Sequence, residues 1–174
     1  DLDALLHRPG AVVDPAQDPI PAANKDPNGA WVNDYGGYIS IGCNAKIVPN
    51  CPTTFADLLK PEYKGQVALN GDPTQAAAAF AGVWASALAN GGSLDNIQPG
   101  IDFWGKVSKS GNLLKVDPNS ATIESGQTPI VLDWDYLNVT QAEKVKASFP
   151  WKVAVPTDGL FAQYYAQAIN KNAP

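Results

Sequence analysis

The stretch QVALNGDPTQ, residues 66–75, decides the fold class of this chain. Its apolar run at 67–69 has the length of a strand, and Asp72-Pro73 follows with residue types that commonly begin helices. The Ala-rich segment 74–89 then predicts a helix, which the Asn-Gly-Gly sequence at 90–92 ends. The stretch therefore predicts a strand that leads directly into a helix.

The same alternation of strand and helix continues along the chain. Apolar runs predict further strands at residues 113–116, 129–132, 151–155 and 161–169. Helices are expected over residues 99–107, after Asp117-Pro118, and over 136–149. This order predicts an α/β domain whose sheet is mostly parallel and flanked by helices.

The first thirty residues differ from the rest. Three Asp-Pro pairs and two further prolines fall within them, so neither a helix nor a central strand can continue through this region. We expect a connector over residues 1–30, an α/β lobe over 31–160 and a returning strand over 161–174.

Composition excludes several classes of protein. The 174 residues carry a net charge of -5 with one Arg and one His, so no basic surface is available for nucleic acid. Apolar runs do not reach the roughly 20 residues that span a bilayer. A single His leaves no His-based triad in the body of the domain, and we expect neither a cofactor nor a metal. The chain lacks Met and a signal-peptide pattern, which indicates a mature or excised segment.

The two cysteines, Cys43 and Cys51, are eight residues apart. They suit a short-loop disulfide in an oxidising compartment or two thiols in a reducing one, and the sequence leaves both alternatives open.

Ligands of open α/β sheets bind beyond the carboxyl ends of the strands. After two of the predicted strands, Thr74, Gln75 and Asn119 stand where helices are expected to begin, and free N–H groups there would suit a phosphate, phosphonate or carboxylate. The alternative is that Asp72 and Asp117 simply cap these helices.

The densest candidate follows the strand at 129–132. Trp134, Asp135 and Tyr136 combine aromatic rings with a carboxylate, which is how proteins receive an organic cation. The alternative is that Trp134 lies in the core while Asp135 caps the next helix. A small hydrolase that uses Asp133 and Asp135 is a further alternative, because residues two apart on a strand share a face.

Two tyrosines complete the candidate binding residues. Tyr164 lies in an alternating run, where it or Tyr165 would reach the crevice unless both are packing residues. Tyr35 precedes Gly36-Gly37, a pair that resembles a hinge at the start of a strand, although a bulge or turn would use the same residues.

Three motifs give the chain a family resemblance. They are WVNDYGGYISIGCNAKIV at 31–48, TFADLLKPEYKG at 54–65 and ESGQ at 124–127. In this order they resemble the type II periplasmic solute-binding proteins of ABC importers, in the branch with ferric-iron, phosphonate, thiamine and polyamine binders. The resemblance implies two α/β lobes with the ligand between them, of which this chain matches the second lobe and its crossover strands.

The resemblance also implies a function and partners. We expect a binding protein rather than an enzyme, periplasmic or extracellular, that binds an amine-, phosphonate- or amino-acid-like solute and docks on a membrane permease. Ferric binders carry a Tyr-Tyr pair where this chain has Asp135-Tyr136, so a ferric complex fits less well. A dimer through the exposed lobe face and an inactive folded fragment are further alternatives.

Overall fold

The computed structural model describes residues 20–28 and 30–168. The chain divides into two compact units, one from residues 1–36 and 163–174 and the other from Gly37–Ala162. Most of the Pro-rich connector and the last six residues of the expected return strand lie outside the described residues. None of the described helices is long and apolar enough to cross a membrane.

The described elements follow the predicted alternation of strand and helix. The strands are β1 (Val32–Asn44), β2 (Val67–Leu69), β3 (Ile130–Trp134), β4 (Trp151–Ala154) and β5 (Ala162–Gln167). The α-helices are α2 (Ala77–Ala89), α3 (Gln98–Lys109), α4 (Ser120–Glu124) and α5 (Asp135–Val145), with short 3-10 helices at Ala22–Asn24, Ala56–Leu59 and Pro61–Tyr63.

The sheet order is β2-β3-β1-β4, with β5 paired to β1. Strands β2 and β3 are parallel, whereas β1 runs antiparallel to both β3 and β4. Consequently β2, β3 and β4 run in the same direction, as the sequence predicts. Two of the three neighbouring strand pairs in the order β2-β3-β1-β4 are nevertheless antiparallel, because β1 lies between β3 and β4. The strand expected at 113–116 is reduced to a single bridge between Leu113 and Val67.

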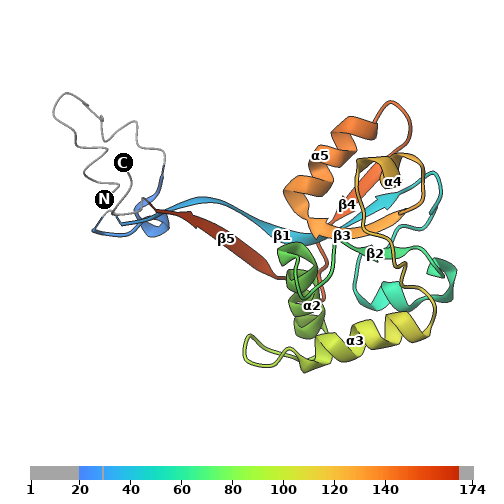
Figure 1. The fold of residues 1–174 in the computed structure, drawn as a ribbon, viewed down its shortest axis with the longest axis horizontal. Coiled ribbons are helices and arrows are strands. Elements are labelled where there is room, and N and C mark those ends of the chain that lie inside the picture. Colours follow the sequence, from blue (N-terminus) through green and yellow to red (C-terminus); the bar gives the residue numbers. More distant parts are fainter. Residues whose placement is uncertain (1–19, 29, 169–174) are drawn as a thin grey trace. The chain divides into compact units, whose positions relative to one another are not determined.

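Helices cover both faces of the sheet in the unit Gly37–Ala162 (Figure 1). Helices α2 and α3 pack on one face, over a core that includes Ile39, Val67 and Leu132. Helices α4 and α5 pack on the other face, around Val131 and Trp151. The expected α/β fold with flanking helices is therefore confirmed.

Two helix starts differ from the prediction. Helix α2 begins at Ala77 rather than Thr74, because Asp72 accepts both the N–H and the hydroxyl of Thr74 at 2.8 Å and holds a turn there. Helix α4 is capped by Asn119 and not by Asp117. In both places a side chain that hydrogen-bonds to nearby backbone decides where the helix starts.

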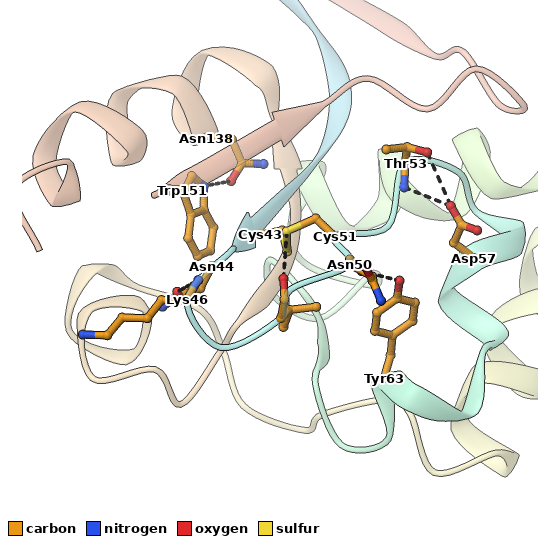
Figure 2. Close-up of a disulfide and its surroundings, with 11 residues drawn as sticks. Cys43, Asn44, Lys46, Asn50, Cys51, Thr53, Asp57, Tyr63, Asn138 and Trp151 are labelled. Carbon is orange, nitrogen blue, oxygen red and sulfur yellow. Dashed lines mark hydrogen bonds between the residues drawn. A yellow bond between two sulfur atoms is a disulfide. The ribbon is translucent and has the colours of Figure 1, made fainter. Parts of the chain in front are cut away.

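Cys43 and Cys51 form a disulfide, which resolves the alternative left open above. Figure 2 shows that it joins the end of β1 to the loop before the first of the two adjacent 3-10 helices. The same loop is held by the Tyr63 hydroxyl, which donates to the Asn50 carbonyl at 2.6 Å. Asp57 fixes its far end by accepting the N–H of Thr53 at 3.0 Å.

Candidate functional site

The carboxyl ends of β2 and β3 lie at one edge of the sheet because these strands are parallel neighbours. We call this edge the rim, formed by residues 70–75 and 133–136. Its two halves are joined where Asn70 donates its backbone N–H to the Leu132 carbonyl at 3.1 Å. The Asn70 side chain also hydrogen-bonds to the Asp133 carboxylate.

Asp133 is the buried carboxylate of the rim, with 9% of its surface exposed. Burial raises its pKa, while hydrogen bonds from the Asn70 side chain and the Trp134 N–H oppose that rise. The Trp134 bond is 2.8 Å long. Asp133 is therefore a structural acceptor inside the domain.

Asp135 begins α5 and connects it to β1. Its Oδ1 atom accepts the N–H of Tyr136 at 2.9 Å and the N–H of Tyr38 at 3.1 Å. Both bonds use one carboxylate oxygen, and no bond from a described residue reaches the Oδ2 atom. The predicted capping role of Asp135 and its predicted role toward a cation are thus compatible, because the second oxygen is available.

Trp134 lies in the core. It is 3% exposed and stacks on Tyr136, with ring centroids 6.4 Å apart and planes 5° apart. In this arrangement its indole offers no open face to a solute. Tyr136 is half-buried and is the aromatic residue of the pair that reaches the surface.

Thr74 and Gln75 are both exposed and line a cavity of about 730 Å³ at the start of α2. The N-cap residue of this helix is Ala76, which has no side chain able to cap. Among the described residues no acceptor is found for the N–H groups of Ala77, Ala78 and Ala79. Ala77 is exposed, whereas Ala78 and Ala79 are buried, so the start of α2 presents the Ala77 N–H group and the positive end of the helix dipole.

Asn119 does not offer comparable donors. Its side-chain oxygen accepts the Thr122 N–H at 3.0 Å, and its own N–H donates to the Thr122 hydroxyl at 2.9 Å. This reciprocal capping box occupies the start of α4, which has only five residues. Neither Asn119 nor Trp134 lines the cavity that Thr74 and Gln75 line.

Tyr35 and Tyr164 belong to the smaller unit, which is described by itself. Tyr35 is half exposed and stacks on Tyr165 with ring centroids 4.6 Å apart. Tyr164 is 64% exposed and lies over Gly36, where an added Cβ would come within 2.5 Å of its ring. Tyr164 is thus the exposed member of the pair and Tyr165 the packed one.

Sequence reasoning gave no role to the Asn70 side chain or to the Tyr38 N–H, which hydrogen-bond to the rim carboxylates of Asp133 and Asp135. Asn70 is the last residue of the predicted strand segment, and its polar side chain at the end of an apolar run was the available signal. Tyr38 carried no such signal, because its link to Asp135 uses only the backbone N–H.

Comparison with known protein families agrees with the family resemblance that the sequence motifs indicate. A family model described as "Bacterial extracellular solute-binding protein" matches residues 10–174. No curated protein sequence matches the chain.

Solved structures of similar fold include several periplasmic binding proteins. The periplasmic binding protein P5PA is 19% identical with a TM-score of 0.64, over 84% of this chain and 45% of that one. AfuA from Actinobacillus pleuropneumoniae, with bound fructose-6-phosphate, is 16% identical with a TM-score of 0.62, over 82% and 45%. Iron-bound HitA from Pseudomonas aeruginosa is 17% identical with a TM-score of 0.55, over 86% and 48%. The chain spans about half the length of these proteins.

Proposed function

We propose a function from one premise: this chain belongs to the family of bacterial extracellular solute-binding proteins. On that premise, it supplies one lobe of the substrate-binding component of an ABC importer, and the rim is the part of this lobe that contacts the solute. The observation that carries the proposal is the parallel pairing of β2 and β3, which brings residues 70–75 and 133–136 to one edge.

The rim offers two kinds of chemistry to a small polar solute. The N–H group of the exposed Ala77, at the positive end of the α2 dipole, favours an anionic group such as a phosphonate or carboxylate. The Asp135 carboxylate, whose Oδ2 atom accepts no bond from a described residue, and the half-buried ring of the adjacent Tyr136 favour a positively charged group. A zwitterion of the aminophosphonate or amino-acid class would use both.

Binding fits this rim better than hydrolysis. The family is one of transport proteins and not a class of enzymes. The hydrolase alternative needs an accessible pair of carboxylates, whereas Asp133 is buried and already accepts two hydrogen bonds. Asp135 uses one oxygen to hold α5 and β1 together.

The transport step that we propose follows from differential affinity. A solute that contacts two lobes at once favours the state in which they close on it, and that closed state would dock on the permease. One lobe alone buries less of the solute, so we expect weak binding by this chain.

The test is an NMR titration of the isotope-labelled chain with 2-aminoethylphosphonate, because chemical shifts report weak binding. We expect the amides of Ala77, Ala78 and Ala79 to shift, and Asp135→Asn to weaken the affinity roughly tenfold by removing a charged acceptor. Asp95→Asn is the matched control, since it removes the same charge from an exposed loop.

Methylphosphonate separates the two groups of the ligand. It lacks the amine, so its affinity should be unchanged in Asp135→Asn. If Asp135→Asn changes the affinities for the two ligands equally, Asp135 does not bind the positively charged group. No shift at the start of α2 with either ligand would remove the rim as the solute site.

A further inference from the structure

The cavity beside the rim is lined by residues of the rim and by residues of helices α2 and α3. Its lining includes Pro73, Thr74 and Gln75 of the rim, and its remaining residues belong to α2 and α3 or directly precede these helices. The apolar side chains among these remaining residues are Ala76, Ala77, Phe80, Val83, Ile97, Ile101 and Trp104. The described residues that line it include no charged side chain, so the cavity suits an uncharged group.

Two of the wall residues are unusually exposed for their size. Phe80 is 48% exposed and Ile101 is 50% exposed, although both face a concave surface. Covering such side chains removes apolar area from water, which favours an occupant with a hydrophobic surface.

A third wall residue, Trp104, carries an unused polar group. It is 7% exposed, and its indole Nε1–H has no hydrogen-bond partner among the described residues. The Nε1 atom itself is buried from solvent, so Trp104 contributes the apolar surface of its ring, and not its N–H group, to the cavity wall.

The dimensions of the cavity favour a small molecule over a protein surface. A volume of about 730 Å³ falls within the range of small-molecule pockets. A stable protein partner would instead bury roughly 800 Å² on each side of a broader interface. Moreover, the lining includes residues 73–75 of the rim and Ala77, whose N–H group has no acceptor among the described residues.

We infer that the solute is amphiphilic: its anionic group binds at the start of α2 and its hydrophobic group fills the cavity between α2 and α3. This inference rests on the proposed function and deepens it, because it specifies the class of solute. Phosphonates or carboxylates with an aromatic or branched aliphatic substituent meet the description.

The experiment compares two ligands that share a head group, phenylphosphonate and methylphosphonate, by NMR titration of the labelled chain. We expect phenylphosphonate to bind roughly tenfold more tightly, because its ring leaves water for the cavity. The amides of Ala77, Ala78 and Ala79 should shift with both ligands, whereas the Trp104 indole N–H should shift only with phenylphosphonate.

Two variants locate the hydrophobic group. Ile101→Gln and Phe80→Gln replace half-exposed wall residues, so both should fold, and each should reduce the advantage of the phenyl group. Val139→Gln is the matched control, a 52% exposed position on α5, on the other face of the sheet. It should leave both affinities unchanged.

Each outcome has a distinct meaning. Equal binding of the two phosphonates, with shifts only at the start of α2, overturns the inference and leaves the proposed anion position standing. The inference is also overturned if phenylphosphonate still binds more tightly than methylphosphonate, by the same factor as in wild type, in both wall variants. A shift of the Trp104 indole with protein concentration and no ligand would show instead that a second copy occupies the cavity, and would overturn it too. A Trp104 shift without shifts at the start of α2 would overturn both the inference and the proposed anion position.

Discussion

The Asp135 carboxylate accepts the backbone N–H of Tyr38 at 3.1 Å, across 97 residues of sequence. The same oxygen accepts the N–H of Tyr136 in the first turn of α5. One atom therefore fixes the start of a helix to the strand beside it. The adjacent Gly37 leaves room for this contact, since an added Cβ would lie 2.5 Å from Asp135 Oδ1.

The first prediction concerns the stability that this link provides. We expect Asp135→Ala to lower the free energy of unfolding by about 1–3 kcal/mol, because two backbone donors lose their acceptor. Asp135→Asn keeps an oxygen acceptor and should cost less than Asp135→Ala. Urea unfolding measures both, and Asp95→Ala on an exposed loop should change stability by less than about 0.5 kcal/mol. Equal costs for the Ala and Asn variants would show that the acceptor is not what matters.

The second prediction concerns the space beside Gly37. A methyl group there would also meet the Tyr136 ring at 2.7 Å, so Gly37→Ala should destabilise the domain by about 1–3 kcal/mol. Gly105→Ala is the matched control in the interior of α3, where an added Cβ has nothing within 4 Å. That variant should gain about 0.5–1 kcal/mol from helix propensity. Thermal unfolding of both variants checks the opposite signs.

The local pattern of the sequence was sufficient to predict the alternation of strands and helices. Runs such as 67–69 and 129–132 are apolar because both faces of the sheet are covered, and this gives a signal that does not depend on distant residues. Strand direction is different. Nothing local in β1 specifies that it runs antiparallel between β3 and β4, because order and direction are set by how the chain crosses the domain.

Helix starts and the candidate site were predicted less well, for related reasons. Asp72 has the residue type of a cap, yet its carboxylate binds Thr74 in a turn that precedes the helix, and a pattern does not separate these uses. Trp134 was a candidate binding residue by position, but its burial depends on α2 packing over the sheet. The role of Asp135 toward Tyr38 depends on a contact that no local spacing encodes.

The third prediction concerns the Cys43–Cys51 disulfide. Its bond closes a loop with a sequence separation of 8, for which chain entropy gives a stabilisation of about 2–3 kcal/mol. The variant with Ser at both positions should unfold at a correspondingly lower urea concentration than the oxidised chain. The reduced wild-type chain is the control, and it should be destabilised by a similar amount. If reduction leaves the midpoint unchanged, the loop is held by other contacts, such as the Tyr63 bond to Asn50.

The last prediction is a pH dependence with opposite signs at two carboxylates. Burial raises the pKa of Asp133 above its ordinary value of about 4. Its contribution to stability is therefore complete at low pH and is lost as pH rises through the folded pKa. The difference in unfolding free energy between wild type and Asp133→Asn should consequently become less favourable to wild type as pH rises from about 3 toward neutrality.

Asp57 provides the contrast in the same experiment. Although partial burial raises its pKa, hydrogen bonds from Lys60, Thr53 and Thr54 outweigh that effect and hold the pKa well below its ordinary range. Its contribution is complete above a pH of about 4 and is lost as pH falls. The cost of Asp57→Asn should therefore be largest near neutral pH and shrink toward pH of about 3, which is the reverse of Asp133→Asn. Chemical unfolding at several pH values measures both slopes, and two slopes of the same sign would contradict the assignment of Asp133 as a carboxylate destabilised by burial.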